Sequence, residues 1–355
     1  MQHGAWIVVA VLASGCRDKP TGDGPAAAPV VARVAQDAVL EDLAALREQI
    51  EAQDRDGQLG PAVANAERLV AELRARKLTG DRRFALALEL LGRLLFHAGR
   101  WKEAEPTIDE ALAMPIAKTD RELRSMLLFD QGSIYSGQRR NDEAIAVMQE
   151  SLALTEELHG KDSFDAANTG EVLAAVYDYA GRYAEAEVLF RRSIAVHEKD
   201  SDARPVDLGR ALANLALNLE YQERDDDALV IYRRALPLLE QAKGSDATGL
   251  AEAQAGLARI LHRKPGKLKE SEAAFRQALA TRRAALGDEH PSVAMDYHNL
   301  AIVLEDQRKL DDALAACESS EEMRRKLLAP DHPHRLNTEG TCERLRKIVR
   351  LRRRR

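Results

Sequence analysis

Histidine residues gather near the C-terminal end of the sequence, at His298 and in the segments 289–291 and 332–334. Imidazole nitrogens are common zinc ligands, but a helical zinc site needs two ligands one turn apart. The sequence has no His-x-x-x-His pair with a carboxylate and no cysteine pair at metal spacing. His290 and His332 each precede a proline, a residue that favours helix starts. We therefore predict that these histidines form turns and that no metal ion is bound.

Sequence motifs for catalysis are missing as well. The chain contains no glycine-rich phosphate loop, no Gly-x-Ser-x-Gly nucleophile turn and no zinc-protease signature. Charged residues make up 31% of the chain and aromatic residues only 4%, which is typical of helices with solvated outer faces. We predict that the protein is not an enzyme, that it has no catalytic residue and that it uses no cofactor.

Three cysteines, Cys16, Cys317 and Cys342, offer thiol chemistry. A thiol can accept a lipid, form a disulfide or remain reduced in an apolar core. The spacing of the three residues does not decide among these fates. Which of these fates applies to each cysteine depends on the structural element that contains it.

A repeated pair of helices accounts for most of these elements, and it is clearest in the segment 173–196. Small and apolar residues recur there at helical spacing on both sides of Gly181, which predicts two helices with facing apolar sides. The second helix contains a small anchor residue that recurs along the chain at intervals of 42, 40, 42, 42, 43 and 42 residues. This period predicts seven helical hairpins. The anchors are Ala62, Ala104, Ala144, Ala186, Ala228, Ser271 and Ala313.

Small and large side chains alternate in register with these anchors. The small residues about twelve positions before the anchor let two helices approach closely, and larger residues four positions after the anchor fill space between the helices. The small residues are Gly92, Gly132, Ala174, Ala216, Ala258 and Ala301, and the larger ones are Ile108, Met148, Phe190, Tyr232, Phe275 and Cys317.

This pattern, with GR-W/Y-x-E-A at the start of the second helix, resembles the tetratricopeptide repeat. The period, the sequence LGDEHPSVA at 286–294 and the Asn-Leu-Ala triplets at 214–216 and 299–301 resemble the 42-residue type found in kinesin light chains. The resemblance implies an all-α, right-handed superhelix of about seven hairpins closed by a capping helix. It also implies a binding scaffold, without specifying the partner.

The predicted organisation follows from these signals. It comprises a signal peptide at 1–15, a lipidated cysteine and flexible linker at 16–34, a repeat array at 35–333, a capping helix at 334–350 and a basic tail at 351–355. The seven units of the array lie near 35–77, 78–120, 121–163, 164–203, 204–247, 248–290 and 291–333.

Cys317 and Cys342 both occupy apolar positions, the first in a second helix and the second in the capping helix. Their helices are expected to pack together at the last interface of the array. Two interpretations remain open, namely two buried reduced thiols or a disulfide that joins the helices.

The first helices of the hairpins are expected to line the binding groove, as they do in the tetratricopeptide family. In that family an Asn on this face commonly hydrogen-bonds a peptide backbone, which implies this role for Asn214 and Asn299. The alternative is that these residues solvate the groove or bond the adjacent helix. The candidate groove residues are Arg93, Glu171, Arg210, Asn214, Arg259, His298 and Asn299.

The N-terminal segment 1–16 reads as an export signal, because its apolar run is too short to span a bilayer. Its end, Leu-Ala-Ser-Gly-Cys, is similar to the lipobox of bacterial lipoproteins, which implies diacylation of Cys16. The usual Lys or Arg near the start is missing, so a plain cleaved signal or a misassigned start remains an alternative. Arg17 stands where an inner-membrane retention signal would have Asp, which favours the periplasmic side of the outer membrane.

The net charge of −6 is unevenly distributed, because residues 335–355 hold nine Lys or Arg and two Glu. These cations could favour the negative end of the last helix dipole, contact an anionic headgroup or bind another acidic partner. Export of the protein from the cytoplasm argues against nucleic acid as a partner of these residues.

From the sequence we predict a non-catalytic scaffold that binds a protein or peptide in the bacterial envelope and is anchored by lipid on Cys16. A more specific alternative is an assembly factor for an outer-membrane machine, similar to the lipoprotein pilotins. An alternative of another class is a cytoplasmic sensor or regulator, which requires that the signal peptide is not used.

Overall fold

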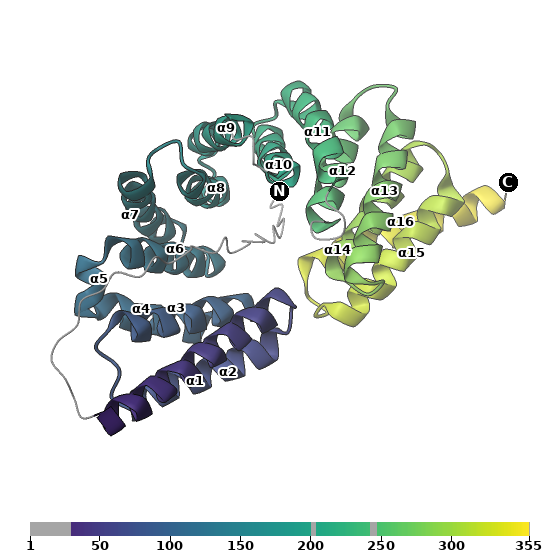
Figure 1. Ribbon diagram of the computed structural model, residues 1–355. Coiled ribbons are helices and arrows are strands. Elements are labelled where there is room, and N and C mark those ends of the chain that lie inside the picture. Colours follow the sequence, from purple (N-terminus) through teal and green to yellow (C-terminus); the bar gives the residue numbers. More distant parts are fainter. Residues whose placement is uncertain (1–29, 200–203, 242–246, 355) are drawn as a thin grey trace. The chain divides into compact units, whose positions relative to one another are not determined.

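The structure, a computed structural model, describes residues 30–199, 204–241 and 247–354, with side chains from residue 43 onward. The predicted signal peptide, Cys16 and the linker as far as residue 29 lie outside these described residues. Within them, the regular elements are sixteen α-helices (Figure 1). They are α1 (Val30–Arg55), α2 (Leu59–Ala75), α3 (Arg82–His97), α4 (Trp101–Ala113), α5 (Pro115–Thr119), α6 (Arg121–Gly137), α7 (Asn141–His159), α8 (Phe164–Tyr179), α9 (Tyr183–Lys199), α10 (Pro205–Tyr221), α11 (Asp225–Leu239), α12 (Ala247–Arg263), α13 (Leu268–Leu286), α14 (Pro291–Asp306), α15 (Leu310–Leu327) and α16 (Pro333–Arg353).

The helices follow one another as seven hairpins and a final single helix, so the all-α repeat architecture predicted from the sequence is confirmed. The first helices of the hairpins are α1, α3, α6, α8, α10, α12 and α14, and each is followed by its second helix. The short helix α5 is an addition at the end of the second hairpin. Helix α1 begins at Val30, so it includes the last five residues of the stretch predicted as linker.

Every hairpin turns at one residue with left-handed backbone, five positions before the anchor, with φ between 60° and 75°. This residue ends the first helix. In the second hairpin, for example, the N–H of Arg100 donates to the carbonyl of Leu95 at 2.9 Å, in the manner of a Schellman cap. The left-handed residues are Gly57, Gly99, Arg139, Gly181, Glu223, Gly266 and Arg308.

In six hairpins a basic residue directly follows the left-handed residue, and Arg100, Arg140, Arg224 and Lys309 each pair with an acidic residue of the preceding hairpin. Arg140 donates to Glu143 of its own hairpin and to Glu105 of the preceding hairpin, both at 2.6 Å. The same register explains the GR-x-x-E pattern of the sequence, because the Arg and the Glu meet across one helical turn. The equivalent contacts to the preceding hairpin include Arg224–Glu187 (2.8 Å) and Lys309–Glu272 (2.6 Å).

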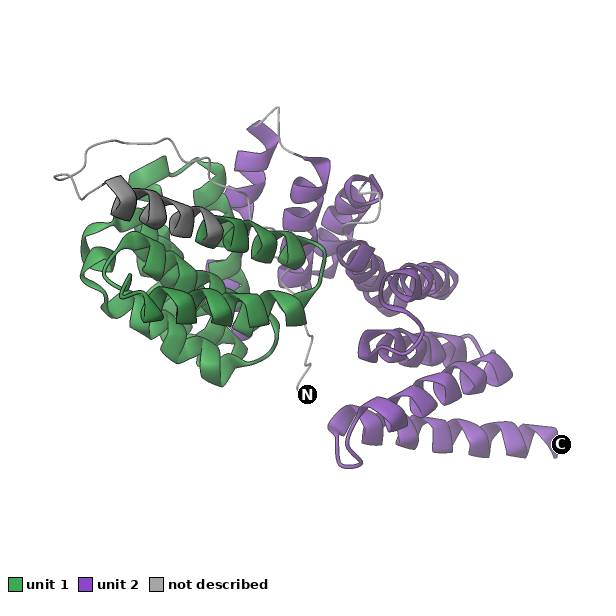
Figure 2. Ribbon diagram, turned by 60° about the horizontal axis from the view of Figure 1, so that its bottom comes forward, with its two compact units in different colours: residues 1–176 green, residues 177–355 purple. Residues whose placement is uncertain are grey.

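The chain divides into two compact units, residues 1–176 and 177–355, shown in separate colours in Figure 2. In unit 1, helices α1 to α4 pack each on the next, α6 packs on both α3 and α4, and α7 packs on α6. In unit 2, each helix from α9 to α16 packs on the next, and the first helices α10 and α12 also contact each other. Contacts between neighbours in the chain therefore build both units, as expected for a repeat array.

Small residues receive large side chains at the positions that the sequence predicted. A Cβ atom added to Gly92 would lie 2.5 Å from Cδ1 of Ile108 in the same hairpin, and one added to Gly132 would overlap Met148. In unit 2 the buried ring of Tyr232 lies over Gly256 of the next hairpin, two positions from the predicted small residue Ala258, and a Cβ at Gly256 would also overlap the ring. These interfaces have no room for a methyl group, which holds the register between helices.

Two histidine turns also agree with the sequence. His290 precedes α14 and accepts the N–H of Ser292 on Nδ1 at 3.1 Å, and His332 precedes α16 and accepts the N–H of His334 at 3.2 Å. Both histidines thus cap helices that begin with proline. No helix among the described residues is long and apolar enough to cross a membrane.

Candidate functional site

The candidate groove residues all lie on first helices, and we call the side of these helices that carries them the first-helix face. Arg93 lies on α3 and Glu171 on α8, in unit 1. The members in unit 2 are Arg210 and Asn214 on α10, Arg259 on α12, and His298 and Asn299 on α14. The contacts of each side chain decide which of them are available to a partner.

Arg93 is held by acidic residues of two first helices. Its Nη1 lies 2.9 Å from Oδ2 of Asp54 on α1, and its Nε lies 3.3 Å from Oε1 of Glu89 on α3. Burial opposes the charge of Arg93, but Glu89, Asp130 and Asp54 raise its pKa above the ordinary value. Arg93 therefore stays charged and joins the first helices of neighbouring hairpins.

Arg259 makes the same kind of contact in unit 2. Its Nε and Nη2 each lie 3.1 Å from a carboxylate oxygen of Glu220 on α10, which makes a bidentate pair. Glu220 also accepts from Arg263, and Arg259 lies 3.6 Å from Glu252. The guanidinium groups of α12 are thus paired with carboxylates. Most of these carboxylates belong to the preceding hairpin.

These pairs have a regular sequence separation that the groove prediction did not use. Asp54 and Arg93 are 39 residues apart, and so are Glu220 and Arg259. Arg344 of α16 pairs with Glu305 of α14 at the same separation. A search for opposite charges about one repeat apart would have found this ladder of ion pairs.

Three other candidates have limited exposure or intramolecular contacts. Arg210 donates to Oδ1 of Asp207, one turn earlier on α10, at 3.3 Å. Glu171 and His298 are each 7% exposed, so neither lies on an open face as predicted. On α8 the more exposed side passes through Asn168 and Ala175, and Glu171 lies at its edge.

His298 is covered because the capping helix packs against α14 at this position. Its Nδ1 lies 3.2 Å from the hydroxyl oxygen of Thr338 on α16. Burial and the nearby Arg324 and His334 lower the pKa of His298 to about 4, so its imidazole is neutral at pH 7. His298 belongs to the interface with the cap.

Asn214 and Asn299 differ from their charged neighbours. Both are half-buried, and neither side chain forms a hydrogen bond with the part of the chain that the structure describes. They lie in the same unit, at the same position of first helices two repeats apart. Each amide offers two donor hydrogens and an acceptor oxygen. They are the groove candidates whose hydrogen-bonding groups remain available.

Buried carboxyl groups near the same helices were not predicted from the sequence. Oδ1 of Asp178 accepts from Nδ2 of Asn218 at 2.6 Å, and burial raises the pKa of Asp178 to about 7. Oδ2 of Asp296 accepts from Nε of Arg282 at 2.8 Å, while its Oδ1 has no hydrogen-bond partner among the described residues. Burial raises the pKa of Asp296 to about 6 although Arg282 opposes the shift. The positions of Asp178 and Asp296 in the sequence do not distinguish them from solvent-exposed acids. Only their burial in the structure identifies them as unusual carboxyl groups.

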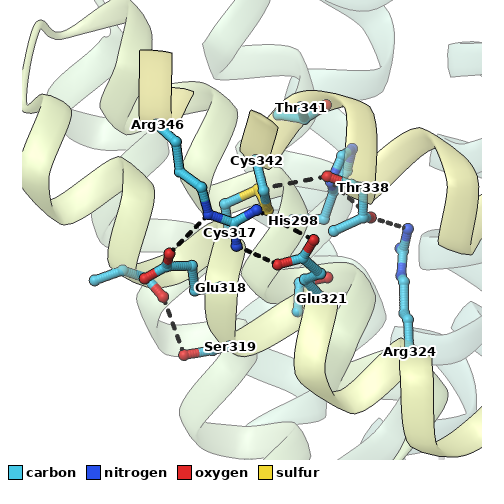
Figure 3. The surroundings of a disulfide bond; sticks show 12 residues. His298, Cys317, Glu318, Ser319, Glu321, Arg324, Thr338, Thr341, Cys342 and Arg346 are labelled. Carbon is cyan, nitrogen blue, oxygen red and sulfur yellow. Dashed lines mark hydrogen bonds and ion pairs between the residues drawn. A yellow bond between two sulfur atoms is a disulfide. The ribbon is translucent and has the colours of Figure 1, made fainter. Parts of the chain in front are cut away.

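The last interface of unit 2 contains a disulfide, the second of the two interpretations left open by the sequence. Cys317 of α15 and Cys342 of α16 are bonded, with their Cα atoms 5.6 Å apart, and both are fully buried (Figure 3). Arg346 reaches from α16 to Glu318 and Glu321 beside the bond. The cap is thereby joined covalently and electrostatically to the last hairpin.

The described residues include no group of three His, Cys, Asp or Glu side chains arranged to hold a metal ion. A shallow pocket of about 270 Å³ lies between α13, α14 and α15, and Tyr297 and Met323 are among its lining residues. Its Arg283 pairs with Asp288 at 2.6 Å and its Lys326 with Glu289 at 2.9 Å. The pocket is small for a polypeptide, and its lining includes neither Asn214 nor Asn299.

Helical hairpins that pack in sequence and present first helices with available amides define a helical-repeat protein of the scaffold class. Two sequence models described as tetratricopeptide repeat match the chain, one at residues 122–199, 207–284 and 261–326 and the other at 87–122. The chain belongs to the tetratricopeptide repeat family.

Solved structures share this fold. BtubC (BKLC) from P. vanneervenii is 21% identical, with a TM-score of 0.51 over 68% of this chain and 93% of that one. The apo form of the quorum sensor NprR from B. thuringiensis is 14% identical, with a TM-score of 0.58 over 88% of this chain and 81% of that one. A Rap protein in complex with competence and sporulation factor is 14% identical, with a TM-score of 0.57 over 86% and 88% of the two chains. Among curated proteins, none matches this chain.

Proposed function

We propose that the protein is a non-catalytic scaffold that binds an extended segment of a partner protein along the first-helix face of unit 2. Membership of the tetratricopeptide repeat family supports a binding role. The observation that carries the choice of face is the pair of half-buried amides, Asn214 and Asn299, which have no hydrogen bond with the described residues. A peptide backbone presents alternating N–H and C=O groups, and an amide side chain can pair with both.

The ion-pair ladder supports recognition of backbone rather than of charge. Arg259 and Glu220 already satisfy each other, so a charged ligand would have to break a bidentate pair to bind either one. An extended segment that bonds to the two amides leaves these pairs intact. The partner is therefore expected to make main-chain contacts to α10 and α14.

The test is affinity capture from cross-linked membranes of the native cell, with the wild-type chain and the variant Asn214→Ala/Asn299→Ala as baits. Each amide lost removes hydrogen bonds worth about 1 kcal/mol, so the double variant should weaken binding roughly 10–100-fold. Quantitative mass spectrometry should find the partner with wild type and not with the variant.

The control is Gln277→Ala/Asn337→Ala, which removes two exposed amides from α13 and α16. It should capture the partner as well as wild type does. Partners that both variants retain equally would contradict the role of the first-helix face. A partner lost equally with both variants would also count against it.

We further propose that the protein works in the bacterial envelope and is tethered by lipid on Cys16, with the outer membrane favoured by Arg17. The disulfide between Cys317 and Cys342 supports export, because disulfides persist in oxidising compartments such as the periplasm. Within this proposal, an assembly factor resembling the pilotins is the more specific role. Deletion of the gene should then lower the amount of assembled secretin.

A cytoplasmic regulator is the second candidate, favoured by the fold that the chain shares with the quorum sensor NprR and a Rap protein. At 14% identity this likeness concerns the fold. The disulfide favours the envelope over this candidate.

A further inference from the structure

Ion pairs distinguish two groups among the basic residues from 344 to 354, at the C-terminal end of α16. Arg346 lies 3.0 Å from Glu318 and also pairs with Glu321, both on α15. Arg344 pairs with Glu305 of α14, and Arg353 lies 2.9 Å from Asp311 of α15. These three cations hold the capping helix to the last hairpin and are neutralised by it.

The second group points away from the hairpin. Lys347, Arg350 and Arg354 are exposed, and none of them forms an ion pair with a described residue. They are spaced three and four residues apart, so they share one side of the helix. Leu351, which is 54% exposed, adjoins them. We call these four residues the outer basic face.

The opposite side of α16 is buried. Thr338, Cys342, Leu345 and Val349 have little or no exposed surface and pack on the last hairpin. The disulfide at Cys342 adds a covalent link on the same side (Figure 3). The cap is thus oriented by its buried stripe, and the outer basic face is presented to solvent in a defined direction.

We propose that the outer basic face docks on the anionic phospholipid surface of a membrane. Phosphate-bearing headgroups attract clustered Lys and Arg, and an exposed Leu beside them can enter the headgroup boundary. The sequence outside residues 335–355 carries a net charge of about −13, so an anionic surface repels it. The charge distribution therefore favours contact through the cap. This contact is independent of the partner on the first-helix face and adds to the proposed lipid on Cys16.

The experiment is sedimentation of the full-length chain carrying Cys16→Ala, so that no acyl chain contributes, with vesicles. The vesicles contain phosphatidylcholine alone or phosphatidylcholine mixed with phosphatidylglycerol. We expect binding to the mixed vesicles only, weakened by added salt. The further substitutions Lys347→Gln, Arg350→Gln and Arg354→Gln should lower the partition coefficient about 100-fold, since each cation near the surface contributes about fivefold.

A matched control removes the same charge elsewhere, with Arg68→Gln, Lys102→Gln and Arg233→Gln, which are exposed and lack ion pairs among the described residues. It should bind the mixed vesicles nearly as well as the parent chain. Circular dichroism melting of both triple variants checks that they fold.

Three results would overturn the proposal. The first is that the parent chain binds both kinds of vesicle equally, or binds neither. The second is that the control triple variant loses as much binding as the α16 triple variant. The third is that the protein binds a duplex DNA fragment through the outer basic face but does not bind the mixed vesicles. That result would assign the face to nucleic acid. None of these outcomes bears on Asn214 and Asn299, so this inference and the proposed function fail separately.

Discussion

Asp178 is a buried acid whose side chain is bonded to an amide rather than to a cation. Nδ2 of Asn218 donates both to Oδ1 of Asp178 at 2.6 Å and to the carbonyl oxygen of Tyr183 at 2.9 Å. This contact joins α8 to α10 within unit 2. Burial disfavours the carboxylate, and the hydrogen bond from Asn218 opposes that effect only in part, so the pKa rises to about 7.

The raised pKa makes stability depend on pH in a defined direction. The ordinary pKa of Asp is about 3.9, so between this value and about 7 the folded chain binds more protons at Asp178 than the unfolded chain does. The contribution to the free energy of unfolding is complete below about pH 4 and is lost as the pH rises through 7. The loss is roughly 2–4 kcal/mol at pH 8.

Asp178→Asn should remove this contribution to the pH dependence, because the amide keeps an acceptor oxygen for Asn218 and cannot ionise. We expect the variant to resist urea better than wild type at pH 8 and about equally at pH 4. Urea unfolding at both pH values measures the difference. Asp130 and Asp296, whose pKa values are also raised, remain in both proteins and cancel in the comparison. An identical pH dependence in the two proteins would contradict the assignment.

At the scale of one element, the hairpin turn repeats with the same backbone and different residues. Gly supplies the left-handed position in four hairpins, whereas Arg139, Glu223 and Arg308 occupy it in the other three. A residue with a Cβ atom costs about 1–2 kcal/mol in this conformation, and Gly avoids that cost. The three hairpins therefore keep a local strain that packing of the helices outweighs.

Replacing Glu223→Gly and Arg308→Gly should stabilise unit 2 by about 0.5–1 kcal/mol each, after the larger unfolded-state entropy of Gly is subtracted. Thermal unfolding followed by circular dichroism measures the gain. The control Glu223→Ala removes the same side chain but keeps the Cβ atom, so it should give no comparable gain. Equal stabilisation by Gly and by Ala would show that the side chain, and not the backbone, carries the effect.

How far the elements could be predicted depends on the range of the interactions. The positions of the helices and turns follow from residues three to sixteen positions apart, as with Gly92 and Ile108, which fills the space beside it. The partners of Arg93 and Arg259 lie 39 residues away, on another hairpin. The spacing within single helices therefore placed the candidate residues on first helices, but it could not distinguish paired charges from available ones.

At the scale of the whole molecule, location depends on the N-terminal segment and the cysteines. The lipobox-like segment ending at Cys16 predicts a lipid anchor, and the disulfide between Cys317 and Cys342 is suited to an oxidising compartment. Neither a lipid anchor nor a disulfide is expected in a cytoplasmic regulator.

Cys16→Ala should abolish lipid attachment. Metabolic labelling with palmitate should mark the wild-type chain and not the variant, and the variant should leave the detergent phase in phase partition. Cys342→Ala is the matched control, because it loses the disulfide but keeps Cys16, and it should be labelled like wild type. Unchanged labelling and fractionation of Cys16→Ala would refute the lipoprotein proposal.

The sequence by itself determined the architecture, because each hairpin is specified by short-range spacing that repeats along the chain. The period of about 42 residues, the small and large packing positions and the histidine turns were all readable in that way. Only the tertiary structure decided which polar groups are satisfied. His298 is buried by a capping helix, Cys317 reaches a cysteine on that helix, and Arg259 meets Glu220 of the preceding hairpin. Exposure and pairing depend on neighbours 25 to 40 residues away, which local spacing does not specify.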